Sequence, residues 1–226
     1  MLQLAHGPAA VRWRRSARAR RASLRIDARG ACVVVTLPAR AARAAGLALL
    51  AGHAAWVAGH LAALPPALAF ADGALVPLGG EPYRVRHVLE GQGRAWLEAG
   101  EIRVAGDLAS LRRRVADLLR AEALRRLAAL AAAKCALAGL AARRVMVKDT
   151  RSRWGSCASD GTLMFCWRVV MAPPLVQDYV VAHEVAHLRH MDHGPRFWAL
   201  VAELTEHRAA GVAWLAAVGP GLLRAG

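Results

Sequence analysis

The alternation of apolar and polar residues divides the chain into a strand-rich first part and a helix-rich second part. Near the amino terminus, Leu24 and Ile26 share one face of an alternating segment, and an apolar run over 32–37 follows an Arg29-Gly30 turn. This pattern is typical of a β-hairpin. The arginines of the segment are therefore expected on the exposed face of a small sheet, and an arm that binds DNA is the less favoured interpretation.

A helix is predicted from about 40 to 64, because apolar residues recur at helical spacing until Pro65-Pro66 stops them. Short strand signals follow, separated by glycines, at 74–78, 83–89 and 94–104. The first part of the chain is thus predicted to be a small antiparallel sheet with one helix.

The pattern changes near Asp107, where we predict a domain boundary between residues 1–107 and 108–226. A long alanine-rich helix is expected from about 108 to 137, ending before Gly139. The elements predicted after it are a strand at 144–148, a hairpin whose second strand covers 162–171, two helices on either side of His193 and an apolar segment at 212–223. These elements predict an α+β fold.

The hairpin of the second part carries a strong turn signal, Asp160-Gly161. If these are its two turn residues, Arg153 faces Arg168 across the strands. Like charges in this position are destabilising unless an acidic group lies between them. That group is either an internal carboxylate such as Asp149 or Asp178, or a substrate carboxylate or phosphate.

The segment with the clearest chemistry is His183-Glu184-Val185-Ala186-His187, followed by His193. On a helix, His183 and His187 lie one turn apart on one face, so both imidazoles can bind one metal ion. Glu184 lies about 100° further round, where its carboxylate can act as general base on a metal-activated water without being a ligand. Three neutral imidazoles favour tetrahedral zinc with one open position, with Mn or Ni as alternative ions. The sequence predicts a zinc-dependent hydrolase.

The surroundings of this motif favour a buried metal helix. Pro173-Pro174 can open the helix, and Asp192, Gly194 and Pro195 break it near His193, so that the third ligand can turn back over the metal. The alternative is a helix that carries ordinary histidines on its surface.

Composition places few limits on the partners. The net charge of +15 over 226 residues will attract polyanions, which leaves open both nucleic-acid binding and a solvated surface with no dedicated partner. Four scattered cysteines indicate neither a disulfide framework nor a thiolate metal site. The amino terminus does not resemble a signal peptide and no segment offers about 20 clean apolar residues, so we expect a cytoplasmic protein that does not span a membrane.

Several strings together resemble the YgjP-like metallopeptidase family, which is related to SprT-like and other minimal zincins. They are Arg153-Trp154-Gly155-Ser156-Cys157, Trp167-Arg168, Met171-Ala172-Pro173, the stretch 178–184, Asp192-His193-Gly194 and Phe197-Trp198. The resemblance implies a zincin-like core, with His183, His187 and His193 as zinc ligands and Glu184 as the catalytic glutamate. Cys166 departs from the asparagine expected of the family.

Three functions are compatible with this site. The first is a zinc-dependent peptidase, and the second is a nucleotide phosphoanhydride hydrolase in which arginines hold phosphate. The third is a nucleic-acid-associated protease similar to SprT-like relatives. Arg153, Arg168 and Tyr179 are the candidates for binding substrate or stabilising an oxyanion.

Overall fold

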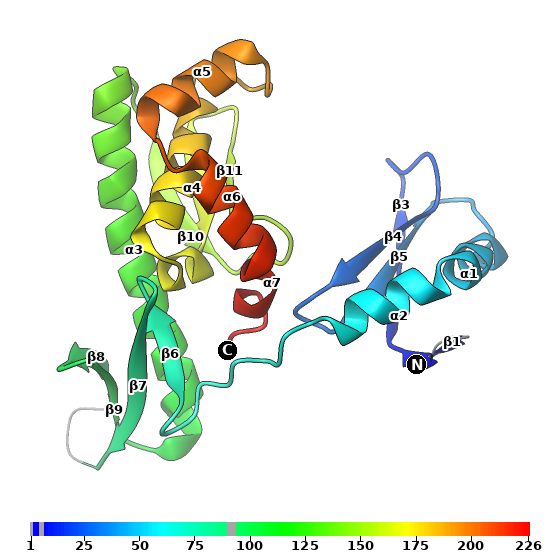
Figure 1. Ribbon diagram of the computed structural model, residues 1–226, viewed down its shortest axis with the longest axis horizontal. Coiled ribbons are helices and arrows are strands. Elements are labelled where there is room, and N and C mark those ends of the chain that lie inside the picture. Colours follow the sequence, from blue (N-terminus) through cyan, green and yellow to red (C-terminus); the bar gives the residue numbers. More distant parts are fainter. Residues whose placement is uncertain (1, 5–6, 90–93) are drawn as a thin grey trace. The chain divides into compact units, whose positions relative to one another are not determined.

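The computed structural model describes residues 2–4, 7–89 and 94–226. The chain forms two compact units, Met1–Ala67 and Leu68–Gly226 (Figure 1). Both contain helices and strands, so the predicted α+β class is confirmed.

The first unit is built around a three-stranded sheet in the order β3-β5-β4. The central strand β5 pairs antiparallel with β4, placing Leu24 opposite Val35 and Ile26 opposite Val33, which confirms the predicted hairpin. On its other side β5 pairs in parallel with β3. The elements of this unit are β1 (Leu2–Leu4), β2 (Gly7–Ala9), β3 (Val11–Ser16), β4 (Ser23–Asp27), β5 (Cys32–Pro38), α1 (Arg43–Gly52) and α2 (Ala54–Ala62).

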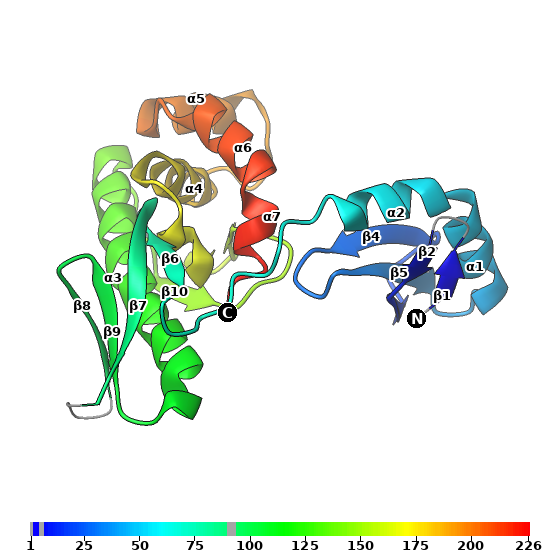
Figure 2. The ribbon, with the colours of Figure 1, turned by 60° about the horizontal axis from the view of Figure 1, so that its bottom comes forward.

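Helices α1 and α2 lie along one face of this sheet (Figure 2). Gly46 lets α1 approach closely, because a Cβ at this position would lie 2.6 Å from the ring of Trp13. The prediction of a single helix at 40–64 is wrong in one respect. The structure has two helices, α1 and α2, which are separated at His53 and meet at an angle of 70°. Glycine has low helix propensity, so Gly52 weakens the helix at this point.

The second unit begins with a four-stranded sheet in the order β6-β7-β9-β8. Its strands are β6 (Leu75–Leu78), β7 (Glu81–Val88), β8 (Ala95–Glu98) and β9 (Glu101–Ala105). The strand predicted at 94–104 is thus two strands, joined by a turn at Ala99 and Gly100. Both turn residues have positive φ, 48° and 76°, as a type I′ hairpin turn requires.

The rest of this unit is mainly helical (Figure 1). Its elements are η1 (Leu108–Ser110), α3 (Leu111–Ala138), β10 (Arg144–Lys148), β11 (Gly155–Cys157), β12 (Thr162–Cys166), η2 (Trp167–Met171), α4 (Pro174–Ala186), α5 (Pro195–Leu204), α6 (Arg208–Ala217) and α7 (Gly219–Leu222). As predicted, α3 ends at Gly139, whose φ of 61° is left-handed. This conformation is common where glycine follows a helix.

The chain divides after Ala67 and not near Asp107 as predicted. Ile102 and Val104 of the sheet belong to the same buried core as Leu119 of α3. The β6–β7 turn also donates two backbone hydrogen bonds to η2, from Gly79 to Val170 (2.8 Å) and from Gly80 to Met171 (3.1 Å). The change of pattern at Asp107 marks a change of secondary structure within one core.

The β11–β12 hairpin has a different register from the predicted one. Gly155 faces Phe165 and Cys157 faces Leu163, because the loop contains three residues, 159–161, with Gly161 at a φ of 80°. A three-residue loop that ends in a left-handed glycine is a common hairpin connection. The strand also stops at Cys166, so Arg153 and Arg168 are not a cross-strand pair.

No single helix in the described ranges has both the length and the apolar character needed to cross a bilayer. The bent pair α1 and α2 meets this requirement only when its two helices are counted together, on length and composition alone.

Candidate metal centre

Helix α4 positions two of the three histidines. It opens with Pro174 at its first turn, where a missing backbone N–H costs nothing, and most of its residues are buried. His183 and His187 lie one turn apart near its carboxyl end, with ring centroids 5.0 Å apart. The helix therefore presents two imidazoles side by side, as its sequence predicts.

The third histidine returns from the segment that follows α4. The centroid of the His193 ring lies 5.2 Å from that of His183 and 4.7 Å from that of His187. One nitrogen from each ring can be chosen so that all three atoms lie within 4.8 Å of one another. The structure thus brings the three predicted metal ligands together.

Phe197 of α5 packs against all three rings, with centroid distances of 5.0 Å to His183, 4.5 Å to His187 and 4.8 Å to His193. Its own side chain is fully buried. Phe197 therefore fixes the imidazoles from one side, a role that the sequence analysis did not assign to it.

Hydrogen bonds leave nitrogen lone pairs for a metal. His187 Nδ1 lies 2.9 Å from the backbone oxygen of His190, and since that oxygen only accepts, Nδ1 carries the proton and Nε2 keeps its lone pair. His183 Nε2 and His193 Nε2 are 3.2 Å apart. Two nitrogens bound to tetrahedral zinc at 2.0–2.1 Å would lie about 3.3–3.4 Å apart. The cluster fits this ion.

The surroundings keep two of these imidazoles neutral. Burial, assisted by the neighbouring histidines, lowers the pKa of His183 to about 4. Burial also lowers the pKa of His187. Because a metal binds the neutral form of imidazole, both side chains are ready to act as ligands at neutral pH.

Glu184 lies beside the cluster with 6% of its surface exposed. It fits there because its neighbour on β11 is Gly155, where a Cβ would come within 2.4 Å of Glu184 Oε1. Burial raises the pKa of Glu184 to about 7, and the charge of Arg153 partly offsets this rise. A carboxyl group with a pKa near neutral is suited to accept and release a proton.

A pocket of about 250 Å³ opens beside this carboxylate. Its lining residues come from the β11 region, α4 and α6: Arg153, Trp154, Gly155, Tyr179, Val180, His183, Glu184 and Leu215. Two of the three predicted substrate-binding residues, Arg153 and Tyr179, therefore lie at the site.

Arg168, the third predicted substrate-binding residue, does not line this pocket. Its side chain is 1% exposed and forms an ion pair with Asp149 at 2.5 Å. It also donates two hydrogen bonds to the backbone oxygen of Ala225, at 3.1 and 2.8 Å. The assignment of Arg168 to substrate is wrong, and of the two alternatives considered for it the internal carboxylate is the correct one.

Arg168→Met is therefore expected to destabilise the fold and to leave KM unchanged in the protein that remains folded. The loss of a buried ion pair and two hydrogen bonds should lower the free energy of unfolding by roughly 2–4 kcal/mol. Urea unfolding measures this loss. The exposed Arg144 of β10 provides the matched control, Arg144→Met, which should change the free energy by less than about 0.5 kcal/mol. A selective rise in KM for Arg168→Met at normal stability would contradict the structural role.

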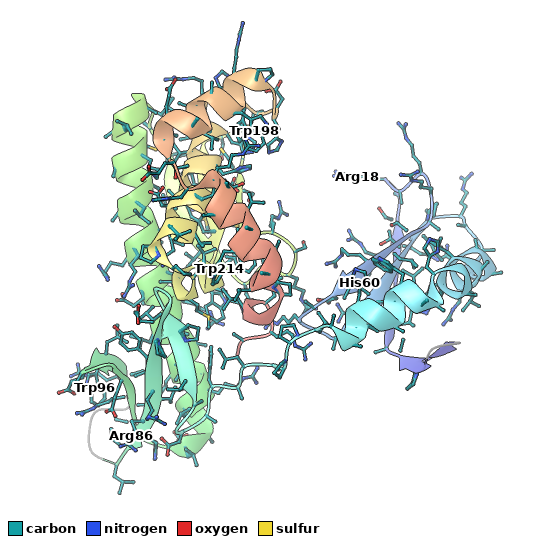
Figure 3. All side chains as sticks on the ribbon, in the orientation of Figure 1. Arg18, His60, Arg86, Trp96, Trp198 and Trp214 are labelled. Carbon is teal, nitrogen blue, oxygen red and sulfur yellow. The ribbon has the colours of Figure 1, made fainter. Side chains whose placement is uncertain are left out.

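Arg208, at the start of α6, is a residue near the site that the sequence analysis missed. Its guanidinium carbon lies 3.6 Å from the ring centroid of Trp198, which Figure 3 shows on α5. After burial and the two other histidines, its charge is a further cause of the lowered pKa of His183. Nothing in the sequence marks Arg208, because α6 brings it here through tertiary packing.

All four cysteines are free thiols. Cys166 is fully buried as a small apolar side chain, whereas Cys157 is partly exposed and burial raises the pKa of its thiol to about 11.

Comparison with known proteins bears on most of the chain. A family model described as the YgjP-like metallopeptidase domain matches residues 20–217. A search of curated proteins gives no match. Among solved structures, the metallopeptidase zymogen abylysin of Pyrococcus abyssi is similar to 41% of this chain and 95% of its own, with 16% identity and a TM-score of 0.38.

Proposed function

Because the chain belongs to the YgjP-like metallopeptidase family, we propose that it is a zinc-dependent peptidase with a zincin-like core. His183, His187 and His193 hold the metal and Glu184 is the general base. The observation that carries the proposal is the convergence of three imidazole nitrogens within 4.8 Å of one another next to a buried glutamate. The neutral imidazoles favour zinc, with Mn or Ni as alternative ions.

The metal, when bound, supplies a Lewis acid that polarises the scissile carbonyl and lowers the pKa of a coordinated water. Glu184 accepts the proton of the attacking water on a carboxylate oxygen and later donates it to the leaving amine. Its buried position keeps the carboxylate out of bulk water, and the small Gly155 leaves it room to reach the reacting atoms. Phe197 holds the imidazole rings in place during the reaction.

Three side chains can bind the substrate or stabilise its developing negative charge. Arg153 and Tyr179 line the pocket, and Arg208 lies close enough to influence the titration of His183 and Tyr179. Arg153 and Arg208 provide positive charge, and the Tyr179 hydroxyl is a neutral donor.

A second candidate, hydrolysis of a nucleotide phosphoanhydride, is favoured by one observation, the presence of two arginines near a single metal site. Guanidinium groups match phosphate geometry, so the same machinery could direct water to phosphorus. The third candidate is a nucleic-acid-associated protease. It would use the same peptide-hydrolysis chemistry as the first candidate and would differ from it only in binding a nucleic acid as partner.

One assay panel separates the first two functions. Purified protein loaded with Zn or Mn is incubated with casein-like peptides and, separately, with nucleoside triphosphates. Cleavage of the peptides alone supports the peptidase, whereas release of phosphate or pyrophosphate alone assigns the site to nucleotides. In either case Glu184→Gln must lower the activity at least about a hundredfold, which excludes a contaminating enzyme.

Glu184→Gln is also expected to stabilise the metal-free protein at alkaline pH. Burial raises the pKa of Glu184 from its ordinary 4.5 to about 7, so the folded protein retains a proton that the unfolded chain has released. The contribution of this group to stability is full below pH 4.5 and is lost as the pH rises through 7. The raised pKa corresponds to about 3 kcal/mol.

Urea unfolding in EDTA, at several pH values, measures this difference. At pH 8 the free energy of unfolding of the variant should exceed that of the wild type by up to about 3 kcal/mol, and the excess should be much smaller near pH 5. The lowered pKa of His183 affects both proteins alike and cancels in the comparison. An excess that does not change with pH would contradict the raised pKa.

A further inference from the structure

The positive charge is concentrated in the first unit. Residues 1–67 contain ten arginines, no lysine and a single acidic residue, Asp27, which gives a net charge of +9 out of +15 for the chain. The other residues contain nineteen arginines and two lysines with fifteen acidic residues. A genomic bias toward arginine would explain its use in both units, but it does not explain why acidic residues are almost absent from one of them.

Most arginines of this unit are exposed to solvent. Asp27 is fully buried and forms an ion pair with Arg12 at 2.7 Å, so it offers no negative charge to the surface. Nine of the ten arginines are exposed: Arg12, Arg14, Arg15, Arg18, Arg20, Arg21, Arg25, Arg40 and Arg43. Figure 3 shows Arg18 on the connection between β3 and β4.

One face of the sheet collects several of these side chains. The register places Arg12 and Arg25 on either side of Val34, and Arg14 opposite Thr36 on the same face. The opposite face is packed against α1 and α2. The sheet therefore has one apolar face toward its own helices and one arginine-lined face.

Tryptophans accompany the arginines in two pockets of the same unit. The larger pocket, of about 370 Å³, is lined by Trp56, Leu24 and Leu49 together with Arg21 and His53. Trp56 is 42% exposed, although tryptophan usually buries most of its ring.

The smaller pocket, of about 250 Å³, is lined by Trp13 and Leu37 with Arg14, Arg15 and Arg43. The guanidinium carbon of Arg43 lies 4.6 Å from the centroid of the Trp13 ring. Each pocket thus places an aromatic ring beside positive charge.

We propose that residues 1–67 form a binding surface for single-stranded nucleic acid. Arg21, which lines the pocket of Trp56, and the neighbouring exposed arginines contact the phosphates, and Trp56 stacks on an unpaired base. A positively charged surface interleaved with aromatic rings is the arrangement by which proteins bind single strands without reading their sequence. The proposal does not depend on the function of the metal centre.

An anionic membrane is the less favourable partner for this surface. A membrane-binding amphipathic helix carries basic residues beside its apolar face. In this unit α1 and α2 contain one arginine, Arg43, and no lysine, whereas the other arginines lie on the strands and loops. Most of the charge is therefore carried by the strands and loops and not by the helices themselves.

Fluorescence anisotropy of the full-length protein with labelled oligo(dT) of about 20 nucleotides tests the proposal. Binding should weaken at least about tenfold between about 50 and 200 mM salt. Trp56→Ala should raise Kd about tenfold, whereas Trp56→Phe should retain most of the affinity, because any aromatic ring can stack. A labelled duplex should lose little affinity with Trp56→Ala.

A matched pair of charge reversals locates the surface. Arg18→Glu with Arg21→Glu should raise Kd at least about tenfold. The control is Arg112→Glu with Arg144→Glu, which changes two exposed arginines of the second unit by the same total charge. This control should raise Kd less than about threefold. Circular dichroism and thermal melting confirm that each variant is folded.

Four outcomes would overturn the proposal: no binding at about 100 mM salt, equal losses for the two charge-reversal pairs, no effect of Trp56→Ala, or binding to vesicles of phosphatidylcholine and phosphatidylserine in preference to oligo(dT). Retention of oligo(dT) binding by His193→Ala would support it, because that variant alters the metal centre alone.

Discussion

Glu184→Gln is expected to lower kcat by about 10²–10⁴-fold while the protein still binds its metal. Glutamine has nearly the same size and can occupy the space next to Gly155, but its amide cannot accept the proton of the attacking water. The imidazole ligands and Phe197, which packs on them, are unchanged. The variant therefore separates proton transfer from metal binding.

The measurement combines steady-state kinetics with the metal content of the purified variant. Glu203→Gln provides a matched control, since Glu203 is exposed on α5 and its substitution removes the same charge. This control should retain normal kcat. Activity that survives Glu184→Gln with metal bound would show that another group is the base.

His193→Ala is expected to weaken metal binding by more than about a hundredfold. Loss of a residue that merely supports a ligand typically costs 10–100-fold, and His193 is proposed as a ligand itself. Its Nε2 lies 3.2 Å from that of His183, so its removal leaves α4 with two imidazoles. Two ligands from one helix do not enclose the ion.

Competition with a chromophoric chelator gives the affinity, and Co²⁺ absorption reports the coordination. His190→Ala is the matched control, because His187 uses the backbone oxygen of His190, which the substitution retains. This variant should bind metal within a few fold of the wild type. Binding at full strength by His193→Ala would exclude His193 as a ligand.

The elements nearest the proposed metal centre are also the ones that local sequence predicts best. The proline-initiated helix α4 and the proline at the start of α5 are both where the pattern placed them. These signals are local, because proline and helical spacing act over a few residues.

The pairing of Arg153 with Arg168 shows where local prediction fails. Asp160-Gly161 marks a turn, but its two-residue and three-residue forms differ by one position, and this difference changes every facing pair. In the structure Arg168 binds Asp149 and the carbonyl of Ala225. Ala225 is distant in sequence, so no local pattern could have indicated it.

Packing over long separations also determined the domain boundary. The change of periodicity at Asp107 is real, since strands give way to α3 there. Which elements share a core depends on how their apolar faces meet, and a single sequence does not record this. Gly155 and Arg208 are further examples, because the importance of each follows from a neighbour on another element.

The sequence by itself determined the helix that carries His183 and Glu184 and ends next to His187, because helical periodicity and an initiating proline are local features. The end of this helix at Ala186 lies before the break predicted at Asp192, Gly194 and Pro195. Only the tertiary structure decided how closely His193 approaches the other two rings, that Glu184 is buried beside a glycine, and that Arg168 is part of the core. Those properties depend on which elements pack against one another, and this packing exists only in the folded chain.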